Sequence, residues 1–235
     1  MTGSLQVNAL VLRKTDYRDY DRMVTLLTPE KGLVEAVARG CRRPKSELMN
    51  AAEPFVCGKY QLFLTHERYT ITQCSLTDGF YKLREDYDRL SEGARWLRLL
   101  AKVAVPEQPA EGLFQTALTA LTYLTHSDID IELLGAMFDM KLSFFSGFAP
   151  LMDRCVSCGR SAESVPLGFS AKRGGCVCEN CQKTIKPLSE GARRILLKAP
   201  RTPYKAVEKL VGHPDVKEAA ARIREVIEYN TEESV

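Results

Sequence analysis

Residues 22–39 read RMVTLLTPEKGLVEAVAR, two runs of β-prone residues on either side of a turn. In the turn, Pro29 suits an early position and Gly32 can adopt a positive φ. The runs 22–28 and 33–39 are therefore predicted to pair as a β-hairpin.

Further strands are predicted on both sides of this hairpin. Residues 5–14 alternate between an apolar and a mixed face, which indicates a strand. Two more runs, 60–64 and 69–73, are joined by a short polar turn that contains His66. Five short strands in so short a segment predict a small barrel, and an OB-fold fits this size best.

After about Tyr81 the apolar period changes from two to about 3.6, which indicates helices. Apolar stripes are predicted at 96–103, 113–124, 133–144 and 216–229, and Ser189 is expected to cap another helix. The fold class is thus multidomain α+β. The expected domains are an OB-fold at 1–80, a helical domain at 81–150 and 184–235, and an insertion at 151–183.

The insertion contains two Cys-x-x-Cys pairs, Cys155 with Cys158 and Cys178 with Cys181, separated by 19 residues. This spacing is typical of a zinc ribbon, in which four thiolates close a tetrahedral structural site around one Zn²⁺. Cys176 is an alternative to Cys178 as a ligand, and buried thiols or disulfides are the alternative to a metal. The single cysteines elsewhere (Cys41, Cys57 and Cys74) are interpreted as small core residues.

Charge is unevenly distributed, although Lys and Arg outnumber Asp and Glu only by 33 to 30. Residues 39–45 carry bases and no acid, whereas residues 230–235 carry acids and no base. Basic side chains near the first strand and in this loop are candidates to contact nucleic-acid phosphates: Arg13, Lys14, Arg18, Arg22, Arg39, Arg42, Arg43 and Lys45. Tyr17 and Tyr20 are available to stack on bases. A solvated loop without a ligand is the alternative.

No catalytic motif is evident. The chain has no Walker, dinucleotide-binding, zinc-protease or serine-hydrolase signature. A zinc deaminase needs a His-x-Glu upstream of its cysteines, and His66 is followed at once by Glu67. Asp19 and Asp21 flank bases in a polar loop and are interpreted as solvated. The sequence therefore predicts a binding protein rather than an enzyme.

The segment 32–46 (GLVEAVARGCRRPKS), followed by Pro54 and Phe55, resembles the first domain of the RecO family of bacterial recombination mediators. The likeness includes the opening strand, the turn at 28–32 and the cysteine pairs, and it covers most of residues 5–185. Cys41, where the family more often has alanine, and Glu47 beside the basic loop depart from its pattern. Beyond about Pro200 the sequence does not match the family's usual basic closing segment and ends instead in a last helix and an acidic tail.

The resemblance implies an OB-fold, a helical domain and an embedded zinc ribbon. It also implies a protein that binds single- and double-stranded DNA, anneals complementary strands, and works with RecR and single-stranded DNA-binding protein to load RecA in gap repair. With no apolar leader or membrane-length run, a cytoplasmic, nucleoid-associated protein without membrane contact is expected. The alternatives are a zinc-ribbon adaptor that contacts only proteins, and a zinc-dependent enzyme that modifies nucleic acid.

Overall fold

The computed structural model describes residues 3–232, except for the side chains of 208–210 and 232. The predicted acidic end, 230–235, therefore lies partly outside the described residues. The chain forms two compact units, residues 1–125 and 126–235. The predicted domains (1–80, 81–150 with 184–235, and 151–183) divide the chain at other positions than these two units and stay a prediction.

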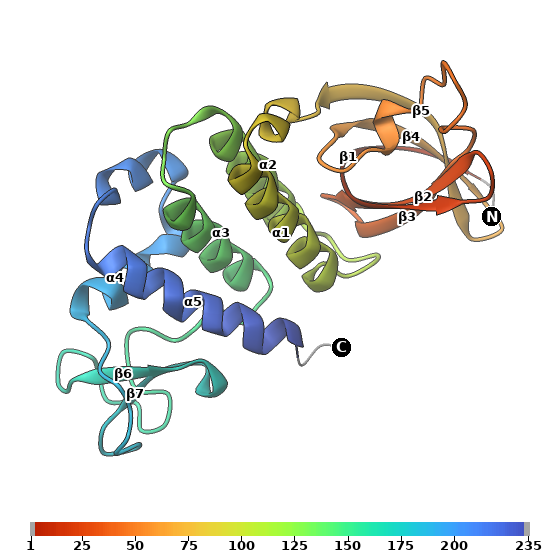
Figure 1. Ribbon diagram of the computed structural model, residues 1–235. Helices are drawn as coiled ribbons and strands as arrows, with labels where there is room; N and C mark the ends of the chain where they lie inside the picture. Colours follow the sequence, from red (N-terminus) through yellow and green to blue (C-terminus); the bar gives the residue numbers. More distant parts are fainter. Residues whose placement is uncertain (1–2, 233–235) are drawn as a thin grey trace. The chain divides into compact units, whose positions relative to one another are not determined.

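The first unit begins with five strands that close into a barrel in the order β1-β2-β3-β5-β4 (Figure 1). Their bounds are β1 Gly3–Tyr17, β2 Asp21–Thr28, β3 Gly32–Ala38, β4 Cys57–Thr65 and β5 Arg68–Asp78. β1 pairs antiparallel with both β2 and β4, and β3 pairs parallel with β5. All five predicted strands are present, and the hairpin at 22–39 is confirmed as β2 and β3.

The barrel core consists of the alternate side chains that its strands point inward, among them Val24, Leu26, Ala36, Tyr60 and Leu62. Alternation decides this arrangement, because successive side chains of a strand face opposite sides of the sheet. The turn between β2 and β3 is tight, since Gly32 has φ +61° and a Cβ there would lie 2.1 Å from the Val105 carbonyl oxygen. Only glycine fits at this position.

Two helices complete the first unit, α1 Tyr87–Val103 and α2 Glu111–His126, with short 3-10 helices at Asn50–Ala52 and Tyr81–Glu85. Asp86 caps α1 by accepting a hydrogen bond from the Arg89 amide. At Gly93 of α1 the nearest side chain is that of Phe55, whose amide donates to the Val11 carbonyl of β1. Helix α1 therefore packs against the barrel through a glycine.

The second unit is mainly helical and contains a small two-stranded sheet. Its bounds are α3 Ile131–Phe145, β6 Leu167–Ser170, β7 Gly175–Cys178, α4 Glu190–Lys198 and α5 Asp215–Glu232, with 3-10 helices at Ala171–Arg173, Ala199–Arg201 and Tyr204–Leu210. Ser189 caps α4 by accepting from the Ala192 amide, as predicted. Among the described residues, the helices include none with the length and apolar character needed to cross a bilayer.

Candidate nucleic-acid interface and metal centre

The turn between β1 and β2 determines which charges meet on the barrel. The antiparallel register places Asp16 opposite Arg22 and Tyr17 opposite Asp21, leaving residues 18–20 as the connection. Directly paired residues point to the same face of a sheet. Asp16 and Arg22 are therefore held side by side by the backbone.

Five charged groups form a continuous chain of ion pairs, here called the barrel ion network: Lys14, Asp16, Arg22, Arg42 and Glu53. Glu53 accepts from Lys14 Nζ through Oε2 and from Arg22 Nη1 through Oε1, both at 2.6 Å. Arg22 Nε lies 3.2 Å from Asp16 Oδ1, and Arg42 Nη1 lies 3.4 Å from Asp16 Oδ2. Three cations are thus arranged around two carboxylates.

Glu53 is the central anion of this network. Burial alone would raise the pKa of its carboxyl, but the hydrogen bonds from Lys14 and Arg22 outweigh burial and lower that pKa. Glu53 therefore stays ionised at neutral pH and holds both cations in place.

The basic loop, residues 39–46, is tied to the β1–β2 turn by its backbone. The Gly40 amide donates to Asp21 Oδ1 at 2.8 Å, and the Arg42 amide donates to the Tyr20 carbonyl at 3.0 Å. The Arg43 guanidinium lies over the Tyr20 ring at 5.1 Å from its centre. These contacts preform the loop, which lowers the entropy lost when a ligand binds.

A second arginine and tyrosine pair extends this surface to the β4–β5 turn. The Arg18 guanidinium lies 5.1 Å from the centre of the Tyr17 ring, and Arg68 Nη1 donates to the Tyr17 hydroxyl at 3.3 Å. His66 and Glu67, which form the turn before Arg68, both have positive φ. The β1–β2 and β4–β5 turns therefore meet at Tyr17.

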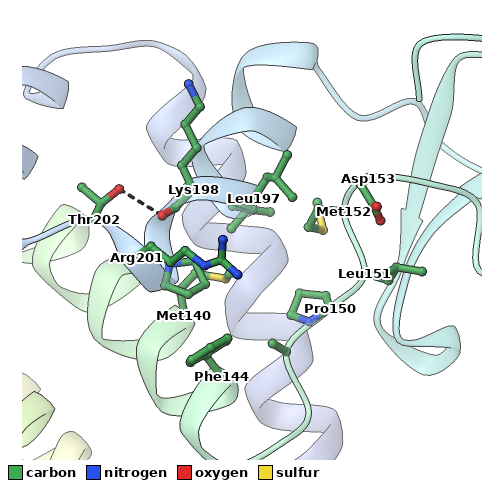
Figure 2. A pocket seen from close by; sticks show the side chains of 13 residues that line it. Met140, Phe144, Pro150, Leu151, Met152, Asp153, Leu197, Lys198, Arg201 and Thr202 are labelled. Atoms are coloured by element: carbon green, nitrogen blue, oxygen red, sulfur yellow. Dashed lines mark hydrogen bonds between the residues drawn. The ribbon is translucent and has the colours of Figure 1, made fainter. Parts of the chain in front are cut away.

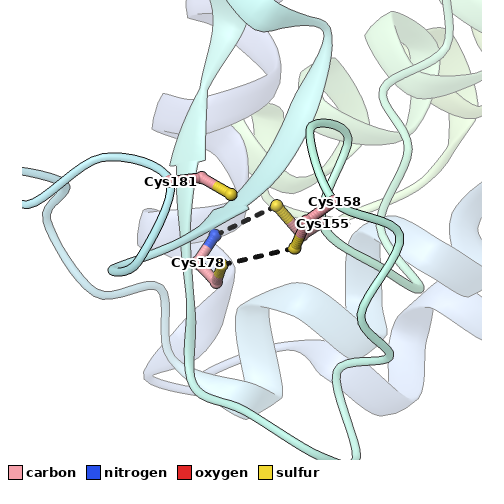
Figure 3. Close-up of side chains that lie close together, drawn as sticks. All are labelled: Cys155, Cys158, Cys178 and Cys181. Atoms are coloured by element: carbon pink, nitrogen blue, oxygen red, sulfur yellow. Dashed lines mark hydrogen bonds between the residues drawn. The ribbon is translucent and has the colours of Figure 1, made fainter.

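In the second unit, the four predicted cysteines Cys155, Cys158, Cys178 and Cys181 come together (Figure 3), with all sulfur atoms within 4.8 Å of one another. The Cys158 and Cys178 sulfurs are 3.6 Å apart. A tetrahedral Zn²⁺ with Zn–S bonds of about 2.3 Å would set its sulfurs roughly 3.8 Å apart. The donor set and its spacing therefore fit a zinc ion.

The backbone favours a thiolate at Cys155, whereas the neighbouring thiols Cys158 and Cys178 raise the pKa of Cys181 to about 12. Burial opposes ionisation of Cys155, but amides of Cys178, Cys158 and Ser157 lower the pKa of its thiol to about 6. The Cys178 amide donates to the Cys155 sulfur at 3.4 Å. Because a metal binds the deprotonated form, this arrangement prepares the site for a cation.

Cys176, the alternative ligand, lies outside the cluster. Its side chain is fully buried, and its sulfur lies 4.0 Å from the Met152 carbonyl oxygen. Burial raises the pKa of this thiol to about 11. Cys176 therefore packs beneath the cluster as a neutral thiol.

Models of known protein families match almost the whole chain. The model of the Recombination protein O N-terminal domain matches residues 1–80, and the model of the C-terminal domain matches residues 84–234. The chain belongs to the RecO family. This membership supports a role in DNA repair and recombination.

Curated RecO proteins align over most of this chain. DNA repair protein RecO of Desulforamulus reducens is 30% identical over 98% of this chain and 91% of its own length. RecO proteins of Alkaliphilus metalliredigens and Symbiobacterium thermophilum are each 34% identical, over 75% and 83% of this chain and 72% and 77% of their own lengths. The RecO C-terminal model matches as far as residue 234, so the family resemblance continues beyond Pro200.

The eight residues predicted to contact DNA fall into three groups according to their contacts in the structure. Lys14, Arg22 and Arg42 belong to the barrel ion network, and the Arg22 side chain is only 17% exposed. Arg18 and Arg43 lie over tyrosine rings. Arg13, Arg39 and Lys45 are exposed and form no ion pair with the residues that the structure describes.

Arg13 does not share a face with Lys14. Arg13 pairs with Thr25 and Lys14 pairs with the core residue Val24, so the two side chains leave opposite sides of β1. The alternation of side chains along a strand already predicts from the sequence that Arg13 and Lys14 face opposite sides. Asp16, Glu53 and Arg68 were missed, because only the register and the approach of distant segments reveal them.

Apart from these two sites, the second unit has a pocket of about 680 Å³ (Figure 2). Its apolar lining includes Met140, Phe144 and Leu197, and Lys198 and Arg201 also line it. The Leu197 and Phe144 side chains are 44% exposed. Exposed apolar side chains gathered in a hollow are typical of a surface that binds a partner.

Proposed function

We propose that this chain is a non-catalytic recombination mediator that binds single- and double-stranded DNA through its N-terminal barrel. It anneals complementary single strands and, together with RecR, promotes loading of RecA on DNA coated by single-stranded DNA-binding protein. It acts in the bacterial cytoplasm, at the nucleoid. One observation carries the proposal: the basic loop is fixed by its backbone to a turn that presents arginines and tyrosines.

The barrel topology supports this proposal. Five strands closed as β1-β2-β3-β5-β4 favour an OB-fold. OB-folds bind oligonucleotides on the face of their second and third strands, between the loops that join strands 1 to 2 and 4 to 5. In this chain, these two loops are joined by the Arg68 to Tyr17 hydrogen bond.

The side chains suit a ligand with phosphates and exposed bases. Arginine contacts phosphate through paired, charge-assisted hydrogen bonds, and tyrosine stacks on bases of any sequence. Tyr20 is 50% exposed, so a base can reach it. Arg18, Arg39, Arg43 and Lys45 would extend the phosphate track beyond Lys14, Arg22 and Arg42, and Arg13 would contact phosphates from the other side of β1. Such contacts bind DNA without reading its sequence.

Annealing on such a surface requires no bond chemistry. Two DNA strands repel each other, and cationic side chains that neutralise phosphates on both reduce this repulsion. Base pairing then supplies the free energy of the reaction. The proposed role therefore assigns no catalytic residue.

The four-cysteine segment is proposed to hold one Zn²⁺ through Cys155, Cys158, Cys178 and Cys181. Four thiolates leave no open coordination position, so this zinc would be structural. The proposed domains are the OB-fold at 1–80, a helical domain at 81–150 and 184–235, and the zinc ribbon at 151–183. The ribbon would keep the shape of a surface that meets protein partners.

The direct test is annealing of complementary oligonucleotides coated with single-stranded DNA-binding protein, with and without this chain. We expect the chain to accelerate duplex formation on the coated strands, and RecR to promote subsequent RecA loading. An unchanged annealing rate at every concentration of the chain would contradict the proposal.

A zinc-ribbon adaptor without DNA contact is the second candidate, and the pocket lined by Met140, Phe144 and Leu197 favours it. Gel mobility of a labelled oligonucleotide separates the two functions. A DNA-binding mediator retards the oligonucleotide at low salt, whereas a pure adaptor leaves it unshifted.

A further inference from the structure

One carboxylate of the barrel ion network lies between two arginines of the proposed DNA surface. Asp16 Oδ1 is 3.2 Å from Arg22 Nε, and Asp16 Oδ2 is 3.4 Å from Arg42 Nη1. Each carboxylate oxygen thus has its own guanidinium. Two non-bridging oxygens of a phosphodiester make the same kind of contact with a pair of arginines.

The two carboxylates of the network are held unequally. Glu53 is 28% exposed and accepts two hydrogen bonds at 2.6 Å, whereas Asp16 is 58% exposed and its contacts are longer. Exposed ion pairs contribute little to stability and are weakened by salt. Asp16 can therefore leave its arginines at small cost, while Glu53 remains bound.

Without Asp16, the Arg22 side chain and the Arg42 backbone would keep their positions. Arg22 is held by Glu53, and the Arg42 amide is held by the Tyr20 carbonyl. The Asp21 carboxylate fixes the start of the same loop through the Gly40 amide. The Arg22 guanidinium would therefore stay in place, and the Arg42 guanidinium would remain attached to a fixed backbone within reach of an anion that replaces the carboxylate.

We infer that Asp16 is an intramolecular competitor for DNA: its carboxylate occupies a phosphate seat between Arg22 and Arg42, and a backbone phosphate displaces it on binding. This inference rests on the proposed DNA-binding function. Asp16 lowers affinity for DNA without removing the seat. A protein that anneals strands must also release the duplex, and a built-in competitor favours release.

Asp16→Asn tests the inference, because asparagine keeps the shape of aspartate and loses its charge. The matched control is Asp19→Asn, which removes the same charge from the same turn. Asp19 is exposed and forms no ion pair or side-chain hydrogen bond with the residues that the structure describes. The readout is fluorescence anisotropy of a labelled oligothymidylate of roughly 16 nucleotides, the upper site size of one OB barrel.

We expect Asp16→Asn to tighten DNA binding about fivefold, the upper limit for one exposed ion pair, and Asp19→Asn to tighten it about twofold or less. The gain from Asp16→Asn should persist at 0.15 M salt, where the Debye length is about 8 Å and longer-range effects fade. In an Arg42→Gln background, the gain from Asp16→Asn should fall to that of the control.

Equal gains from the two variants would overturn the inference, because Asp16 would then act only as one more surface charge. A loss of affinity in Asp16→Asn would also overturn it, since Asp16 would then brace the arginines. Both results differ from failure of the proposed function, in which wild-type protein leaves the oligonucleotide unbound. Thermal unfolding of each variant checks that the barrel is intact.

Discussion

The folded structures of the barrel and of the four-cysteine segment are stabilised by different interactions. The barrel encloses a continuous apolar core with contributions from all five strands. The segment 151–183 has two strands of four residues, and cysteines are prominent among its buried side chains. A region with so little apolar burial depends on cross-links or a metal for stability. The comparison teaches that, if the four cysteines hold the proposed metal, its removal should unfold this segment and spare the barrel.

The largest expected effect is in the cysteine segment. Cys155→Ala removes one of four ligands, and structural zinc binding contributes about 10 kcal/mol or more to folding of small zinc domains. We expect loss of stoichiometric zinc and rapid proteolysis within 151–183, measured by metal analysis and mass spectrometry of the fragments. Cys176→Ser is the control, since Cys176 lies outside the cluster. Full zinc in the Cys155 variant would show that the ligand set is wrong.

The second-largest expected effect is in the barrel core. Leu62 is fully buried in the barrel core, so Leu62→Ala should cost about 3 kcal/mol of unfolding free energy. Denaturant unfolding measures this loss, and addition of a metal chelator should not change it. Phe63→Ala, at a neighbouring side chain that is 41% exposed, should cost much less. A chelator that destabilised the barrel would contradict the independence of the two regions.

The smallest effect concerns charge within the barrel. The lowered pKa of Glu53 means that its ionised form contributes stability above the unfolded-state pKa of about 4.3. This contribution is lost as pH falls through the lower folded-state pKa. Glu53→Gln should therefore destabilise the barrel by up to about 1 kcal/mol at pH 7, with the difference from wild type vanishing in acid. Thermal unfolding at pH 7 and in acid measures it, and a difference independent of pH would contradict the assignment.

Local patterns predicted the strands and the clustering of the four cysteines well. The hairpin at 22–39 follows from alternation and a proline–glycine turn, and the four-cysteine cluster follows from two Cys-x-x-Cys pairs. β6 and β7 were not predicted, because four-residue strands carry too little pattern.

The proposed DNA surface was less predictable, because its order depends on contacts between distant segments. Glu53 reaches Lys14 and Arg22 across 39 and 31 positions of the chain. Runs of positive charge locate bases but not the acids that pair with them. The sequence therefore indicated the loop 39–45 correctly as exposed and basic, and missed Asp16 and Glu53.

The most direct test of the central claim is the salt dependence of oligonucleotide binding by wild type and by the double variant Arg42→Glu with Arg43→Glu. If the basic loop contacts phosphates, charge reversal weakens binding at low salt. The slope of log K against log salt then flattens by about 1.4, the loss of two single-strand phosphate contacts. Unchanged affinity and an unchanged slope would show that this loop is not where the DNA binds.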